Sequence, residues 1–325
     1  MPMLYLAPME ELTGYVFRNV QNRHFGGVDK YFTPFISPDN RITKTRSFRE
    51  LIPENNVGLN VVPQLLTNDS DQFYEGASLI ASLGYKEINI NFGCPSNTVA
   101  AKRKGSGILR DPELMDRFLD GVFCGSSSIL IDHPDIRISA KMRVGYNDTS
   151  DLDRVLPVMA RYPFFEITVH PRLKKDMYNG KPRMDMFDRV CENLSTDIVY
   201  NGDIFSADEH TKISDMLSEK AAGYKCTISA VMIGRGAVSD PGIFRQIRTG
   251  RETTRGELYD FLSDLFETYK AENGAGNALA KLKEVWTYAS AFITDERERS
   301  RTLKSIIKSR TEAEYKDAIT VARFL

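Results

Sequence analysis

The residue of this chain best suited to acid–base chemistry is Cys94, which lies in the run Asn91-Phe92-Gly93-Cys94-Pro95. This run follows the alternating segment Glu87-Ile88-Asn89-Ile90, a pattern typical of a strand. Because Gly93 and Pro95 favour a turn, the thiol is expected to point outward where the strand ends. A thiol placed there can give or take a proton on a bound substrate, and nearby cations tune its pKa. The alternative is a small buried hydrophobe that happens to end a strand.

Further residues that could complete such a site recur along the chain. Lys102, Arg103 and Lys104 lie in a glycine-containing loop after the thiol. The other candidates end or follow predicted strands: Pro8, Met9, Gln64, Asn91, Lys141, Arg143, His170, Arg172, Asn201, Gly202, Asp203, Gly234 and Arg235. Their recurrence at successive strand ends indicates one site at one end of the strands. A lone histidine such as His170 is also compatible with a strand end that holds no ligand.

The segments that must position these residues alternate between strand and helix up to about residue 248. Strands are predicted at 4–7, 31–36, 59–65, 87–91, 138–143, 165–170, 198–201 and 230–233. Helices are predicted at 14–24, 47–51, 71–83, 112–123, 151–162, 184–194, 207–218 and 241–249. Eight strands that are each followed by a helix predict an α/β fold, the TIM (β/α)₈ barrel. A doubly wound sheet is disfavoured because no GxGxxG turn follows the first strand.

The pattern changes after residue 249, where amphipathic helices are predicted at 257–273, 277–293, 299–309 and 312–324. Residues 1–248 are therefore expected to form the barrel, and residues 249–325 a small helical bundle. Six cations crowd the segment between Arg297 and Arg310. They predict either a basic binding face or a solvated helix face balanced by Glu296 and Glu298.

The glycine turns after the seventh and eighth strands favour an anionic ligand. Backbone N–H groups beside Gly202 and Gly234 can approach a phosphate, and Arg235 can add a charge-assisted hydrogen bond. In barrels this is the usual phosphate site. A phosphate there would place a nucleotide-sized ligand over the barrel mouth, where Lys141 could oppose negative charge on a reduced flavin. The alternative is that both glycines only close tight turns.

Composition narrows the class of protein. The chain has 325 residues, a net charge of −1 and 42% hydrophobic residues, with a mean hydropathy of −0.34. No apolar run approaches the roughly 20 residues that span a bilayer, and the N-terminus lacks a basic leader. The four cysteines contain no CxxC pair, which argues against a zinc site or a disulfide framework and for a reducing cytoplasm. A monomer without membrane or metal partners is the resulting expectation.

Several motifs together resemble those of the tRNA-dihydrouridine synthases, in the order in which that family has them. They are Ala7-Pro8-Met9, the Cys94 run with its basic GxG loop, Lys141-Met142-Arg143-Val144-Gly145, Val169-His170, Asn201-Gly202-Asp203-Ile204 and Val231-Met232-Ile233-Gly234-Arg235-Gly236. The family places its RNA-binding domain in the helices that follow the barrel. The Cys94 stretch resembles the bacterial members most.

This resemblance implies an FMN enzyme that uses NADPH to reduce a uridine in RNA, most often tRNA, to 5,6-dihydrouridine. It assigns the flavin ring to Pro8, Met9, Gln64, Lys141 and His170, and the ribityl chain and phosphate to Asn201, Gly202, Asp203, Gly234 and Arg235. It makes Cys94 the proton donor to uracil C5, opposite the hydride that reaches C6. It places Asn91 and Arg143 near the uracil. The cations Lys102, Arg103, Lys104 and Arg172 are expected to bind RNA phosphates.

The chain departs from the family at two loops. His170-Pro171-Arg172-Leu173 replaces the usual His-Gly-Arg-Thr, which removes a backbone donor and a hydroxyl. The first loop, Met9 to Gly14, lacks the usual glycine after the acid. Two other functions remain open: a flavin-dependent reductase of a small molecule, like dihydroorotate dehydrogenase or an ene-reductase, and an inactive barrel that binds RNA. Neither the reduced uridine nor the reductant preference follows from the residues.

Overall fold

The structure is a computed structural model that describes residues 2–39, 42–126 and 128–324, with side chains described up to residue 320. Its contacts divide the chain into two compact units. The first, here the barrel unit, comprises Met1–Pro8, Asp29–Asp203 and Ser214–Met232. The second, the helical unit, comprises Met9–Val28, Ile204–Ile213 and Ile233–Leu325. The helical unit thus draws on segments of the chain before residue 248 as well as on its C-terminal part.

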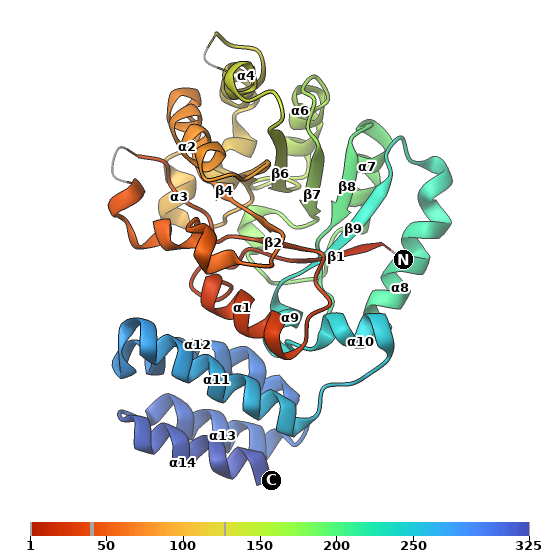
Figure 1. Cartoon of the computed structure of the whole chain (residues 1–325). Coiled ribbons are helices and arrows are strands. Elements are labelled where there is room, and N and C mark those ends of the chain that lie inside the picture. The colour runs from red at the N-terminus through yellow and green to blue at the C-terminus, as the bar shows by residue number, and fades with distance from the viewer. Residues whose placement is uncertain (1, 40–41, 127, 325) are drawn as a thin grey trace. The chain divides into compact units, whose positions relative to one another are not determined.

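The strands form one sheet in the order β3-β2-β1-β9-β8-β7-β6-β5-β4 (Figure 1). Their bounds are β1 Met3–Leu6, β2 Lys30–Phe32, β3 Val61–Val62, β4 Gln64–Leu65, β5 Glu87–Phe92, β6 Arg137–Arg143, β7 Glu166–His170, β8 Asp197–Tyr200 and β9 Ile228–Ile233. The recorded pairings are parallel. The parallel order confirms the predicted TIM barrel.

The predicted strand at 59–65 is divided at Pro63 into β3 and β4. Proline has no backbone N–H, so the ladder is interrupted there. The Pro63 carbonyl still accepts the Asn89 N–H at 2.8 Å. Because β3 pairs with β2 and β4 pairs with β5, the two short strands act as one strand that closes the barrel.

Helices alternate with the strands as predicted: α2 Ser70–Ser82, α4 Pro112–Phe123, α6 Ser150–Met159, α7 Met184–Asn193 and α8 Ala207–Lys220. Their starts have clear causes. Asp69 caps α2 by accepting the Gln72 N–H at 2.9 Å, and Asp111 caps α4 by accepting the Leu114 N–H at 3.0 Å. Short segments also occur at α3 Asn97–Ala101, η4 Gly105–Arg110 and α5 Ile129–Asp132.

The predicted helix at 47–51 is wrong in type, because the segment Arg46–Glu50 is a 3₁₀ helix. Its hydrogen bonds skip only two residues, as in Leu51 N–H to Phe48 O at 2.9 Å. Pro53 follows two residues after Leu51 and holds Ile52 in an extended conformation. The segment is therefore too short to complete α-helical turns before the proline ends it.

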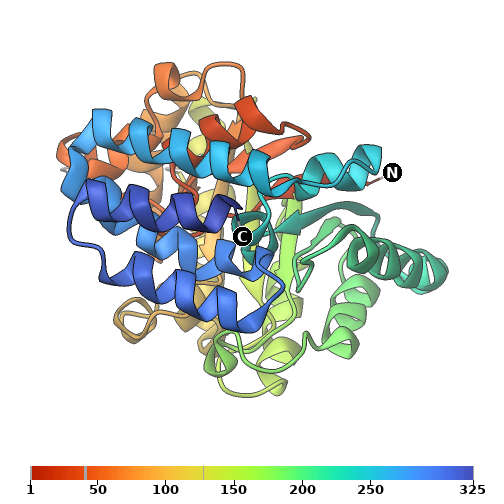
Figure 2. The same cartoon turned by 90° about the horizontal axis from the view of Figure 1, so that it is seen from below.

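The helical unit contains α1 Tyr15–His24, α9 Arg235–Ser239, α10 Ile243–Thr249 and four longer helices, α11 Arg255–Asn273, α12 Ala275–Ala289, α13 Glu296–Lys308 and α14 Glu312–Phe324. The four longer helices, drawn in blue, run beside one another in Figure 1 and Figure 2. A capping box starts α11, in which Thr254 and Glu257 exchange backbone-to-side-chain bonds. Phe17 of α1 packs edge-on against Phe261 of α11 at 5.6 Å. The four predicted C-terminal helices are confirmed.

The barrel interior has an apolar side and a polar side. The apolar cluster consists of Tyr5, Ala7, Phe32, Val62, Val199, Ala230 and Met232. The polar side includes buried glutamates, amides and hydroxyls from β4 to β7. Most buried polar groups in proteins are hydrogen-bonded, and on this side the amides Gln64, Asn89 and Asn91 and the glutamates Glu87 and Glu166 have specific partners. Among the described residues, no helix is long and apolar enough to cross a membrane.

Candidate active site

Cys94 lies on a tight turn directly after β5. The Asn91 side-chain oxygen accepts the backbone N–H groups of Gly93 at 3.0 Å and of Cys94 at 2.8 Å. An asparagine that bonds the backbone two residues on reverses the chain locally. Cys94 is half-buried. The thiol is therefore presented at the strand end, as its position in the sequence predicts.

The GxG loop packs against this turn. Ser106 donates its N–H and its hydroxyl to the Cys94 carbonyl at 3.1 Å and 2.7 Å. A side chain at Gly105 would meet Cys94 at 3.0 Å, and its φ of +56° is one that glycine adopts readily. A side chain at Gly107 would lie 2.4 Å from the Ala100 carbonyl. Both glycines allow the loop to approach the thiol turn closely.

Lys141 and Arg143 extend from β6, the strand next to β5, and Lys141 pairs in register with Asn91. Burial lowers the pKa of Lys141 to about 7, with a further lowering from Arg143 and an opposite effect from Cys94. In the described part of the chain, the Lys141 ammonium has neither a hydrogen bond nor an ion pair. An unpaired buried cation is costly, so this group is placed to receive an electron-rich partner.

Arg143 is almost fully buried and bonds three carbonyls. Its Nε donates to Gly93 O at 3.1 Å, and its Nη1 donates to Leu173 O at 2.9 Å and Met177 O at 2.8 Å. Burial lowers its pKa to about 10, so it stays charged at neutral pH. Arg143 therefore connects the thiol turn to the loop that follows β7.

Gln64 is buried, and its side-chain amide bonds two neighbours on β5. Its Nε2 donates to Asn89 Oδ1 at 2.8 Å, and its Oε1 accepts from Asn91 Nδ2 at 2.7 Å. The role of Gln64 in binding a flavin edge remains a prediction. What its geometry establishes is that Gln64 orients Asn91, and through Asn91 the Cys94 turn.

His170 and Arg172 lie at the end of β7, and Arg172 does not reach the surface. Its guanidinium is fully buried. Nη1 and Nη2 donate to the two carboxylate oxygens of Asp203 at 2.8 Å and 2.5 Å, and Nη1 lies 3.2 Å from His170 Nε2. The guanidinium also donates to the Asn179 and Gly180 carbonyls. The expectation that Arg172 binds RNA phosphate does not fit this placement, because burial inside an ion pair removes it from the surface.

Tyr178 belongs to the same neighbourhood, although its position in the sequence did not single it out. Its ring lies 5.6 Å from the Arg143 guanidinium carbon and 6.3 Å from the His170 ring. The residue is 44% exposed, and Met177 before it has a φ of +52°. An exposed aromatic ring held over a buried cation suits stacking on a planar base. In the sequence, only the position of Tyr178 in the loop after a strand with a polar end could have indicated a role in the site.

In the two predicted phosphate turns, Gly202 and Gly236 are closely packed. In the barrel unit, Asn201 Nδ2 donates to Met232 O at 2.8 Å, and a side chain at Gly202 would lie 2.0 Å from the Tyr200 hydroxyl. In the helical unit, Gly234 precedes the short helix α9, and the Arg235 guanidinium stacks 5.4 Å from the Phe205 ring. A side chain at Gly236 would meet Ile204 O at 1.9 Å. Glycine is required at Gly202 and Gly236 by close packing alone.

The first loop is a compact turn. Pro8 ends its segment of the barrel unit, and Met9 begins a segment of the helical unit. The Met9 carbonyl accepts the N–H groups of Leu12 and Thr13 at 3.1 Å and 3.0 Å. Glu11 has a φ of +64° and forms an ion pair with Lys281. This contact provides a local reason for the atypical sequence of the loop.

The three cations of the loop after Cys94 differ in their exposure and in their hydrogen-bond and ion-pair partners. Lys102 and Arg103 are exposed, and Lys104 is half-buried. Arg103 pairs with Asp111 at 2.5 Å, and Lys104 reaches Gln72 at 3.4 Å. Surface ion pairs are weak, so Arg103 can exchange its partner for a phosphate at little cost.

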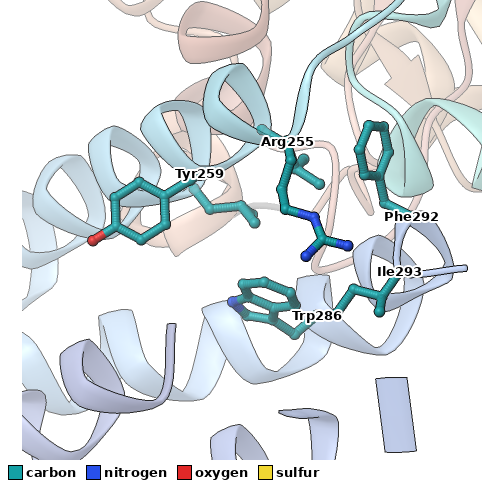
Figure 3. A pocket seen from close by; sticks show the side chains of 7 residues that line it. Arg255, Tyr259, Trp286, Phe292 and Ile293 are labelled. Carbon is teal, nitrogen blue, oxygen red and sulfur yellow. The ribbon is translucent and has the colours of Figure 1, made fainter. Parts of the chain in front are cut away.

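Two hollows lie elsewhere. One of about 420 Å³, in the barrel unit, is lined by residues of α8 such as Leu217, by residues of β9 such as Ile228, and by Cys226 between these elements. The other, in the helical unit, lies among Arg255, Tyr259, Trp286, Phe292 and Ile293 (Figure 3). At about 20 Å³ it holds roughly one water. Neither is lined by a predicted site residue. Within the described ranges, no cluster of three or more His, Cys, Asp or Glu side chains suits a metal ion.

Comparisons with known proteins give a matching family profile and a similar fold. The profile of the dihydrouridine synthase (Dus) family matches residues 5–320. The tRNA-dihydrouridine(16) synthase of Aquipseudomonas alcaligenes is 28% identical over 86% of this chain and 87% of that protein. The tRNA-dihydrouridine(16) synthase of Pseudomonas putida is 30% identical over 82% of this chain and 80% of that protein. The solved old yellow enzyme homologue of Zymomonas mobilis covers 77% of this chain and 89% of its own, with a TM-score of 0.52 at 8% identity; that likeness concerns the fold alone.

Proposed function

The chain belongs to the dihydrouridine synthase family, and from this premise we propose that it reduces a uridine of tRNA to 5,6-dihydrouridine. The observation that carries the proposal is the thiol turn. Cys94 is half-buried at the end of β5, next to the unpaired Lys141 and the buried Arg143 of β6. A small-molecule reductase or an inactive RNA-binding barrel would not require this family pattern over nearly the whole chain.

We propose FMN as the cofactor, with Lys141, Gln64 and His170 at its ring. Lys141 suits it because its unpaired ammonium, with a pKa lowered to about 7, would regain charge beside an electron-rich ring. Pro8 and Met9 are proposed at the ring, and Asn201, Gly202 and Asp203 at the ribityl chain and phosphate. Gly234 and Arg235 remain sequence-based predictions for that phosphate. When bound and reduced by NADPH, the flavin supplies the hydride that adds to uracil C6.

The protein side chains then complete the reduction. Addition at C6 places negative charge on uracil O4, and Arg143, charged and buried, can stabilise it with an N–H donor. Cys94 donates its thiol proton to C5. We propose that Asn91 lies near the uracil and holds the turn that carries Cys94 in place. The Tyr178 ring is proposed to stack on the base or on its neighbour.

The uridine must leave the folded RNA to reach this site, at a cost of a few kcal/mol in stacking. We propose that Lys102, Arg103 and Lys104 offset this cost by binding phosphates, and that residues 249–325 bind the rest of the tRNA. Relatives named for position 16 make uridine 16 the first candidate. We further propose that the protein acts in the cytoplasm as a monomer.

The deciding experiment maps dihydrouridine in tRNA from cells with and without this protein. Loss of the modification at position 16, and its return with the wild-type chain but not with Cys94→Ala, is the expected result. The purified protein should be yellow and should oxidise NADPH in a tRNA-dependent manner. An unchanged tRNA modification map would refute the proposal.

A further inference from the structure

A continuous chain of hydrogen bonds joins the Cys94 turn to a carboxylate at the opposite end of β5. The Cys94 N–H donates to Asn91 Oδ1, and Asn91 Nδ2 donates to Gln64 Oε1, at 2.8 Å and 2.7 Å. Gln64 Nε2 donates to Asn89 Oδ1 at 2.8 Å, and Asn89 Nδ2 donates to Ser139 Oγ at 2.9 Å. Ser139 Oγ donates to Glu87 Oε1 at 2.8 Å.

The five hydrogen bonds in this series have the same direction. In each, the donor lies on the side of Cys94 and the acceptor on the side of Glu87. An ionised carboxylate can only accept, so Ser139 must donate to Glu87. The lone pairs of the Ser139 oxygen then receive Asn89 Nδ2, which turns Asn89 Oδ1 toward Gln64. The same logic turns Gln64 Oε1 toward Asn91 and Asn91 Oδ1 toward the thiol turn. The charge on Glu87 therefore selects one of two flips for each amide.

The side chains in this series of hydrogen bonds are shielded from water, and their polar atoms are hydrogen-bonded. These five side chains range from 0% to 7% exposed, so water competes little for their bonds. In such surroundings aligned hydrogen bonds polarise one another, and a reversed amide would place like groups face to face. A reversed Asn91 would direct its NH₂ group at the N–H groups of Gly93 and Cys94 and would open the turn.

Glu87 forms a buried ion pair with Lys30. Its Oε2 lies 3.0 Å from Lys30 Nζ, which also contacts Glu166 Oε1 at 2.9 Å. Arg137 approaches Glu87 at 3.8 Å. Glu166 completes the cluster by accepting from the Tyr5 hydroxyl at 3.1 Å. The two glutamates thus share one buried lysine, yet only Glu87 is bonded to the chain that leads to Cys94.

We propose that Glu87 is a positioning residue for catalysis, which acts through Ser139, Asn89, Gln64 and Asn91 to hold the Cys94 thiol in its reactive place. Glu87 lies five hydrogen bonds from the Cys94 N–H and takes no part in the chemistry itself. The inference rests on the proposed function only in naming Cys94 as the acid. The hydrogen bonds that link Glu87 to the Cys94 turn are observed in the structure and do not depend on the proposed function.

The test compares Glu87→Gln with Glu166→Gln. Each removes one of the two carboxylates that share Lys30, so both weaken the buried cluster alike, but only Glu87→Gln frees the amide chain to reverse. We expect kcat for tRNA reduction to fall at least about tenfold in Glu87→Gln, with KM and flavin content within about twofold of wild type. Glu166→Gln should keep kcat within about twofold. Equal kcat values in the two variants would overturn the proposal.

A second pair guards against a variant that does not fold. Ser139→Ala breaks the series of hydrogen bonds, whereas Thr168→Val removes a neighbouring buried hydroxyl that has no hydrogen-bond partner among the described residues. Peptide-resolved alkylation of Cys94 against pH gives a readout that needs no enzymatic activity. We expect its rate profile to change in Ser139→Ala and not in Thr168→Val, with Ser139→Thr restoring it. Identical profiles would overturn the proposal, whereas a wild-type chain that forms no dihydrouridine would refute only the proposed function.

Discussion

Arg172 and Asp203 form a two-pronged ion pair in which the arginine is fully buried and the aspartate is about one-third exposed. The pair joins the end of β7 to the loop after β8, and the guanidinium also contacts His170. Arg172 thereby orders two other predicted site residues, His170 and Asp203, without facing the solvent. Its length and planar donors suit this bridging position, which lysine could not fill.

Removing one partner of this pair should be costly. We expect Asp203→Ala to lower the free energy of unfolding by about 2–4 kcal/mol, because it leaves Arg172 buried without its carboxylate. Asp153→Ala, which breaks an exposed ion pair with Arg189, should cost less than about 1 kcal/mol. Urea denaturation of both variants without flavin measures the difference. Equal losses would show that burial of the guanidinium adds nothing.

Cys94→Ala should abolish dihydrouridine formation while flavin binding continues. The thiol supplies the proton at uracil C5, and general acid catalysis contributes about 10²–10⁴-fold to the rate. Cys124→Ala is the matched control, because Cys124 is an exposed thiol away from the predicted site residues. Single-turnover assays with tRNA and prereduced enzyme measure the effect. Full turnover by Cys94→Ala would assign the proton to another group.

Replacing Lys102, Arg103 and Lys104 together by alanine should weaken tRNA binding and flatten its salt dependence. Each lost phosphate contact reduces the slope of log K against log salt by about 0.7–0.9. We expect a total change of about 2–3, because Arg103 can exchange Asp111 for a phosphate at little cost. The double variant Lys86→Ala, Lys225→Ala removes exposed cations near the opposite strand ends and should leave the slope unchanged. Filter binding between 50 and 300 mM salt, about the usual range, distinguishes the two.

Lys141 should make the flavin-free protein less stable near neutral pH. Its pKa is about 7 when folded against 10.5 as the reference value, so the unfolded state binds more protons between these values. Stability from this group therefore rises as the pH increases from about 7 toward 10.5. Lys141→Met should raise the Tm by about 3 °C or more at pH 7, and the gain should shrink at pH 10. A gain independent of pH would contradict this explanation.

Tyr178→Ala should lower kcat/KM for tRNA by about tenfold, the effect of losing one stacking contact of 1–3 kcal/mol. Tyr178→Phe keeps the ring over Arg143 and should remain within about twofold of wild type. The two variants separate ring stacking from the hydroxyl. A loss in Tyr178→Phe as large as in Tyr178→Ala would assign the role to the hydroxyl instead.

The alternating elements, the barrel and the four C-terminal helices could all be predicted from the amino-acid sequence. Periodicity and strand-end residues carry that information, because local propensity and burial act on neighbouring residues. The position of Cys94 on a turn could be predicted for the same reason, since Asn91, Gly93 and Pro95 lie beside it. The sequence patterns did not predict that Arg46–Glu50 is a 3₁₀ helix or that the strand is interrupted at Pro63. Both features depend on the backbone geometry of proline, which hydrophobic periodicity does not include.

Tertiary structure alone decided which polar groups find one another. Arg172 looks like a surface cation in the sequence, but Asp203, 31 residues away, draws it into the interior. Gln64 and Tyr178 gain their neighbours only when the barrel closes and the loop after β7 folds back. The direction of the amide chain from Cys94 to Glu87 is likewise invisible in the sequence. Hydrogen bonds between distant residues depend on their arrangement in space, which no local pattern encodes.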